Sequence, residues 1–139
     1  MSFREKSVWI SFLIMLVLFS VWVWNLGRGI TGQAERADVV RLSIILLIFA
    51  VVLEVVLHVG LAIWSPREAR TPRDERERLI ELYATRIAFR VLVGAALLTL
   101  GSAHLGARTG VLMDAMMLSV ILALLVKFGS EVVLFRRGL

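Results

Sequence analysis

Three pairs of charged or titratable residues lie within or beside apolar stretches, and the two members of each pair are four positions apart. The pairs are Glu54 with His58, Arg86 with Arg90, and Lys127 with Glu131. Residues four apart share one face of an α-helix. A carboxylate and an imidazole can exchange protons near neutral pH, and arginines can hold an anionic or polar group. The three pairs therefore indicate a proton-coupled or ligand-binding site.

The elements that must position these pairs are four apolar segments, at about 7–26, 39–64, 83–105 and 111–135. Each is long enough to cross the hydrocarbon core of a bilayer as a helix. The 139 residues are 59% hydrophobic, far above an ordinary soluble domain. The sequence therefore predicts an all-α integral membrane four-helix bundle that forms a single four-span domain over residues 1–139, with the lipid bilayer as its first partner.

Basic residues predict how the bundle is oriented. One side carries the N-terminus, the middle loop and the C-terminus, with Arg4, Lys6, Arg67, Arg70, Arg73, Arg76, Arg78, Arg136 and Arg137. The other side has Arg28, Arg36, Arg41 and Arg108. Since cytoplasmic loops carry the excess of Lys and Arg, we expect both termini in the cytoplasm (N-in/C-in) and the protein in a cell inner membrane.

In this topology the segments 39–64 and 83–105 are antiparallel neighbours. At 1.5 Å per residue, His58 lies roughly 9 Å and Glu54 roughly 15 Å from Trp64, and Arg90 lies roughly 10 Å beyond Tyr83. The last segment brings its own charged pair into the same leaflet. We therefore expect a buried polar cluster of six residues: Glu54, His58, Arg86, Arg90, Lys127 and Glu131.

A purely structural role is the alternative for this cluster. An ion pair between Arg90 and Glu54 would fix the helix register, while Arg86, Lys127 and Glu131 could extend to the cytoplasmic interface. Glu54 is the residue that a structural role explains least, because it lies close to the middle of the membrane. An ionisable group there is a functional hypothesis by default.

The helix that carries Arg86 and Arg90 is expected to start before its apolar part. Thr71 suits the N-cap and Pro72 the first helical position, and no Gly or Pro follows before Gly94. The face with the two arginines continues through Gly94, Leu97 and Gly101. Small residues permit close helix contact, so we expect this stripe to face the bundle rather than lipid.

Two other patterns carry little chemistry. Gly27, Gly29 and Gly32 match G-x-G-x-x-G, but a dinucleotide site needs a preceding strand, so we predict a flexible loop over 25–38. His104, Asp114 and Asn25 are too few to predict a metal site, and a hydrogen bond between helix ends explains them better.

Composition and motifs exclude several functions. The chain has no cysteine, and nothing in it resembles a nucleophile with its base, so we expect neither an enzyme nor a cofactor nor a metal site. The net charge of +5 comes from basic residues that flank apolar segments, where they orient the protein and touch lipid headgroups. We therefore expect no direct binding of nucleic acid.

The run from Pro72 to Ile80, followed by Ala84-Thr85-Arg86, resembles a family of small bacterial four-span membrane proteins of unknown function. The shared feature is a start to the third helix that is rich in Asp, Glu and Arg. Members of this group often look like companions of helix-turn-helix regulators, so the resemblance implies a signalling role. It assigns no catalytic residues.

Two functions remain. The first is a transporter or ligand-binding bundle, as a homodimer, in which Glu54 and His58 couple protons or cations and Arg86 and Arg90 hold an anionic or polar group. The alternative is a regulatory or scaffold membrane protein. It would dock a soluble cytoplasmic partner through the charged turn at 67–81, with Arg73, Arg76 and Arg78 as contact residues.

Overall fold

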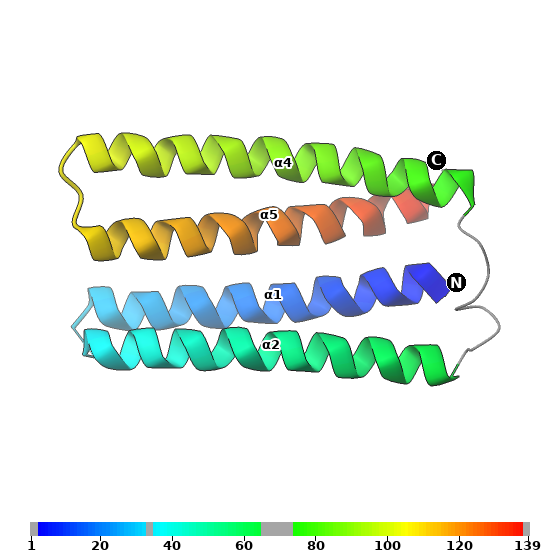
Figure 1. The fold of residues 1–139 in the computed structure, drawn as a ribbon, viewed down its shortest axis with the longest axis horizontal. Coiled ribbons are helices and arrows are strands. Elements are labelled where there is room, and N and C mark those ends of the chain that lie inside the picture. The colour runs from blue at the N-terminus through cyan, green and yellow to red at the C-terminus, as the bar shows by residue number, and fades with distance from the viewer. Residues whose placement is uncertain (1–2, 33–34, 65–73, 138–139) are drawn as a thin grey trace. The chain divides into compact units, whose positions relative to one another are not determined.

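The computed structural model describes residues 3–32, 35–64 and 74–137, and this part of the chain is helical apart from short turns (Figure 1). The helices are α1 (Phe3–Ile30), α2 (Arg36–Trp64), α4 (Glu75–His104) and α5 (Thr109–Arg137). Each has 28 to 30 residues and is long and apolar enough to cross a membrane. The all-helical class and the four membrane-length helices are therefore confirmed, and they indicate a multi-pass membrane protein.

The chain divides into two compact units at Arg73 and Asp74. In the first unit α1 packs against α2, and in the second α4 packs against α5. Both are antiparallel helix pairs: α1 ends at Ile30 and α2 begins at Arg36, while α4 ends at His104 and α5 begins at Thr109. Each pair has its own helix–helix interface.

The interface of the first unit follows one face of α1. The buried residues of α1 recur at helical spacing, at Ser11, Ile14, Met15, Leu18, Trp22 and Asn25. Those of α2 are Val39, Ser43 and Ala50. Large apolar side chains cover the rest of α2, and Ile48, Phe49 and Val52 are all more than half exposed. Apolar side chains over most of a helix surface suit a hydrocarbon environment, which agrees with a membrane span.

Small residues allow the second pair to pack closely. Ile80, Ala84 and Ala88 form the buried face of α4, and Ala84 is fully buried. On α5 the buried residues are Ser119, Ile121, Ala123, Glu131 and Val132. The two alanines, four residues apart at 84 and 88, let the backbones approach each other, as small residues do where helices associate in lipid.

The two helices α1 and α2 extend into the loop expected at 25–38. Helix α1 continues to Ile30 and α2 begins at Arg36, so Gly27 and Gly29 are helical and the expectation of a flexible loop is wrong for them. Gly32 has φ 72, a left-handed conformation that glycine adopts without steric cost. A Cβ at Gly29 would lie 3.0 Å from Val39 Cγ2, so this glycine lets the start of α2 pack closely on α1.

Helix α4 begins at Glu75, three residues after the first helical position expected at Pro72. Asp74 is the N-cap, in an extended conformation with φ −69 and ψ 148. Aspartate is among the residues preferred at an N-cap, although the Asp74 side chain makes no capping hydrogen bond. Thr71 and Pro72 lie outside the described residues. The expected unbroken helix through Arg86 and Arg90 is confirmed, since α4 continues to His104.

Candidate functional site

A hydroxyl on α1 joins the two titratable residues of α2. Ser11 Oγ donates a hydrogen bond to Glu54 Oε1 at 2.9 Å and lies 3.5 Å from His58 Nε2. Ser11 is 3% exposed, and Glu54 and His58 are half-buried. The three side chains therefore form one polar network between two membrane-length helices.

Backbone geometry decides which imidazole nitrogen can exchange a proton. His58 Nδ1 lies 2.8 Å from the backbone carbonyl oxygen of Glu54, one helical turn earlier. A carbonyl oxygen can only accept, so Nδ1 carries hydrogen in both the neutral and the charged imidazole. Nε2 is therefore the nitrogen that gains or loses the proton, and it is the one that faces Ser11.

Ser11 was missing from the sequence-based cluster, although its depth could have indicated it. It lies eight residues after the start of α1, which is about 12 Å along the helix. That depth falls between the roughly 9 Å of His58 and the roughly 15 Å of Glu54 from the end of α2. Antiparallel neighbouring helices place residues of similar depth side by side, so the sequence alone could have placed Ser11 beside Glu54 and His58.

A second polar contact holds the opposite end of the same helix pair. Asn25 is 1% exposed, and its Nδ2 donates to the Val39 carbonyl oxygen at 2.9 Å and to Ser43 Oγ at 3.1 Å. Hydrogen bonds between helices fix their register in a membrane. Asn25 is thus part of the α1–α2 interface, while the His104 ring bonds to the Leu100 carbonyl oxygen of its own helix at 3.0 Å.

The charged pair of α5 lies in the second unit. Lys127 Nζ is 3.7 Å from Glu131 Oε1, and Glu131 is 5% exposed. This oxygen is buried and makes no hydrogen bond within the described part of the chain. The carboxylate of Glu81 on α4 also acts on Glu131 through its charge. The pair is thus a buried carboxylate balanced by one partly exposed ammonium group.

Arg86 and Arg90 lie on the outer face of the α4–α5 pair. Both are exposed, as are Gly94, Leu97 and Gly101 on the same stripe, whereas the face packed on α5 carries Ala84 and Ala88. Within the described residues of α4 and α5, neither guanidinium forms an ion pair. The six-residue cluster combines residues of both units and stays a prediction.

The proposed contact residues of the charged turn are only partly described. Arg76 and Arg78 are exposed in the first turn of α4, and Arg73 lies outside the described residues. The acidic residues Glu75 and Glu77 alternate with them in the same turn. This polar start precedes the apolar part of the helix.

An apolar groove of about 260 Å³ runs along the α1–α2 pair. Its lining is Leu13, Ile14, Val17, Leu18, Val21, Leu46, Phe49, Ala50 and Leu53. Successive residues of an α-helix are rotated by about 100° around its axis. Relative to the direction of Ala50, Leu46 and Phe49 are therefore rotated by about 40° and 100° to one side of α2. Glu54 and His58 are rotated by about 40° and 80° to the other side. The groove and the polar network therefore occupy opposite flanks of the interface, and acyl chains suit the groove.

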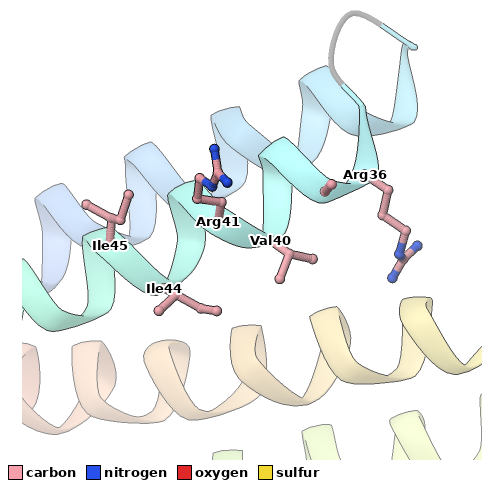
Figure 2. Close-up of a pocket in the computed structure, with 6 residues that line it drawn as sticks. Arg36, Val40, Arg41, Ile44 and Ile45 are labelled. Carbon is pink, nitrogen blue, oxygen red and sulfur yellow. The ribbon is translucent and has the colours of Figure 1, made fainter.

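A second hollow lies along the first turns of α2, where Figure 2 shows Arg36 and Arg41 beside aliphatic side chains. Its lining is Arg36, Ala37, Val40, Arg41, Ile44 and Ile45. All of these residues come from one helix, which cannot enclose a ligand by itself. We therefore assign no binding site here.

Within the described residues, no group of three or more His, Cys, Asp or Glu side chains could hold a metal ion. The network at Ser11 offers one carboxylate and one imidazole, fewer than the three or four protein ligands that zinc takes. The three groups of the network, a carboxylate, a hydroxyl and an imidazole, can form hydrogen bonds and pass protons to one another.

Comparison with known proteins found no match among family models, curated proteins or solved structures. The resemblance of the segment 72–86 to small four-span bacterial proteins therefore stays a prediction. The candidate site depends on the geometry of Ser11, Glu54 and His58 alone.

Proposed function

We propose that the chain is a small inner-membrane transporter or ligand-binding protein, with both termini in the cytoplasm, that is coupled to protons at Glu54 and His58. The hydrogen bond from Ser11 to Glu54, with His58 Nε2 beside the same hydroxyl, carries the proposal. This network lies within two helices of membrane length. Titratable groups in such segments are rare and mark ion or proton pathways.

Protonation of Glu54 provides the coupling. A carboxylate anion is costly in an apolar environment, and binding a proton or a cationic solute removes that cost. A solute that binds preferentially to one protonation state changes the population of that state, and the proton affects the solute by the same factor. The network can thus link the movement or binding of a solute to pH.

Arg86 and Arg90 hold an anionic or polar part of the ligand in this proposal. Their exposure on the outer face of the α4–α5 pair supports this role, since a guanidinium in hydrocarbon needs a polar partner. A homodimer would supply further walls for the pathway, because the described residues of one chain provide only four helices of membrane length.

Native mass spectrometry of the protein extracted from its own membrane tests the proposal. We expect a dimer that retains a small molecule, whose chemistry is then read from the released mass. A complex with a soluble protein and no small molecule would instead support the second candidate function. A bare monomer would contradict both the dimer and the bound ligand.

The second candidate function is a regulatory or scaffold protein that docks a soluble cytoplasmic partner through Arg73, Arg76 and Arg78. The exposure of Arg76 and Arg78 at the polar start of α4 favours it. Basic and acidic residues alternate there, so a partner with a complementary pattern of charges would fit.

Charge reversal at these three positions (Arg73→Glu, Arg76→Glu and Arg78→Glu) is expected to release a docked partner, because like charges would then face each other across the contact. Cross-linking in cells, followed by purification and mass spectrometry, measures how much partner stays bound, and we expect this amount to fall about tenfold or more. Arg136→Glu with Arg137→Glu is the matched control, since these arginines are exposed at the end of α5. Full retention of every partner in the triple variant would contradict docking at this turn.

A further inference from the structure

We infer that the Ser11 hydroxyl is a relay that passes a proton from His58 to Glu54. This inference depends on the proposed proton site and adds to it a residue from the neighbouring helix. Ser11 Oγ lies 2.9 Å from Glu54 Oε1 and 3.5 Å from His58 Nε2, so one oxygen atom stands between the two titratable groups.

The hydrogen bond that Ser11 donates differs from those that Ser20 and Ser119 donate. Ser20 Oγ donates to the Leu16 carbonyl oxygen at 2.8 Å and Ser119 Oγ to the Ala115 carbonyl oxygen at 2.7 Å, each within its own helix. That is the usual way in which a serine satisfies its hydroxyl in a membrane helix. Ser11, which is 97% buried, instead donates its hydrogen bond to the Glu54 carboxylate on the neighbouring helix α2.

The tautomer of His58 completes the chain of donors. Nδ1 stays protonated because it faces the Glu54 carbonyl oxygen at 2.8 Å. When the imidazole is neutral, the lone pair of Nε2 faces an oxygen whose hydrogen is directed to Glu54, which agrees with the longer 3.5 Å separation. When Nε2 is protonated, it can donate to Ser11 Oγ.

The transfer step balances within these three groups. The Nε2–H bond of the imidazolium breaks as a new O–H bond forms at Ser11, and the original Ser11 proton bonds to Glu54 Oε1. The products are a neutral imidazole, an intact serine and a carboxylic acid. A charged pair thus becomes a neutral pair, which an apolar environment favours.

Depth gives the direction of the relay. His58 lies nearer the end of α2 than Glu54, so a proton that enters from that end meets the imidazole first. The charged or titratable groups nearest to this network along the described parts of the two helices are Glu54 and His58 on α2 and, five to seven residues before Ser11 on α1, Arg4, Glu5 and Lys6. Ser11 is therefore a positioning and transfer group between a shallow acid and a deeper base.

A rate measurement tests the relay. A light-triggered pH drop, followed by infrared spectroscopy of the full chain in nanodiscs, records the carboxylic acid C=O band of Glu54, which Glu54→Gln identifies by its loss. We expect Ser11→Ala to slow the appearance of this band about 100-fold. Ser11→Thr, which keeps the hydroxyl, is expected to restore the rate, and Ser20→Ala is the matched control on the same helix.

His58→Gln should slow the appearance of the Glu54 band as much as Ser11→Ala does. The double variant should be no slower than either single variant, because both substitutions interrupt the same proton path. Wild-type rates in Ser11→Ala, with circular dichroism showing intact helices, would overturn the relay and leave the proton site in place. Absence of any Glu54 band in the wild-type protein would overturn the proposed function together with the relay.

Discussion

Glu54→Gln is expected to abolish pH-driven solute accumulation in proteoliposomes. Glutamine keeps the shape of the side chain and a carbonyl oxygen that can accept the Ser11 hydrogen bond, so the helices should remain folded. It cannot bind or release a proton in the physiological range. The coupling between proton and solute is therefore lost while the packing of α1 on α2 is kept.

The measurement uses liposomes with an imposed pH gradient and a panel of organic cations, organic anions and alkali cations, with their contents read by mass spectrometry. In the wild-type protein, at least one solute should accumulate in proportion to the gradient. Glu35→Gln, at an exposed carboxylate just before α2, is the matched control and should accumulate it normally. Equal accumulation in Glu54→Gln and the wild type would exclude Glu54 as the coupling group.

Hydropathy and the absence of helix-breaking residues were sufficient to predict the helices. The apolar segments are long enough to cross a membrane, and backbone groups in lipid must be satisfied within a helix. The same reasoning predicted that α4 continues from its charged start through Arg90. It predicted too long a loop between the first two helices, because Gly27 and Gly29, which are helical, were assigned to that loop.

The candidate site was only partly predictable for a different reason. Charged residues within apolar segments are conspicuous in a sequence, so Glu54 and His58 were identified. Ser11 carries no charge, and serine is common in membrane helices, so its role emerges only from the contact with Glu54. Periodicity also placed Arg86 and Arg90 on one face, but it cannot tell which face packs, and Ala84 and Ala88 take that place on α4.

The ion pair of α5 gives the second large expected effect. Lys127→Met removes the ammonium group 3.7 Å from a carboxylate that is 5% exposed. The uncompensated buried charge should lower the free energy of unfolding by about 3 kcal/mol. Unfolding in mixed micelles with increasing dodecyl sulfate, followed by circular dichroism, measures this change. Lys127→Arg keeps the positive charge, so its free energy of unfolding should fall much less.

The double variant Lys127→Met with Glu131→Leu separates a structural from a functional role. If the pair only stabilises α5, replacing both charges by apolar side chains should recover stability to within about 1 kcal/mol of the wild type, and solute accumulation should be unchanged. Recovered stability with lost accumulation would instead assign the pair to the pathway. Unchanged stability in Lys127→Met would show that Glu131 does not depend on this partner, because a buried carboxylate anion without its counter-charge must destabilise the fold.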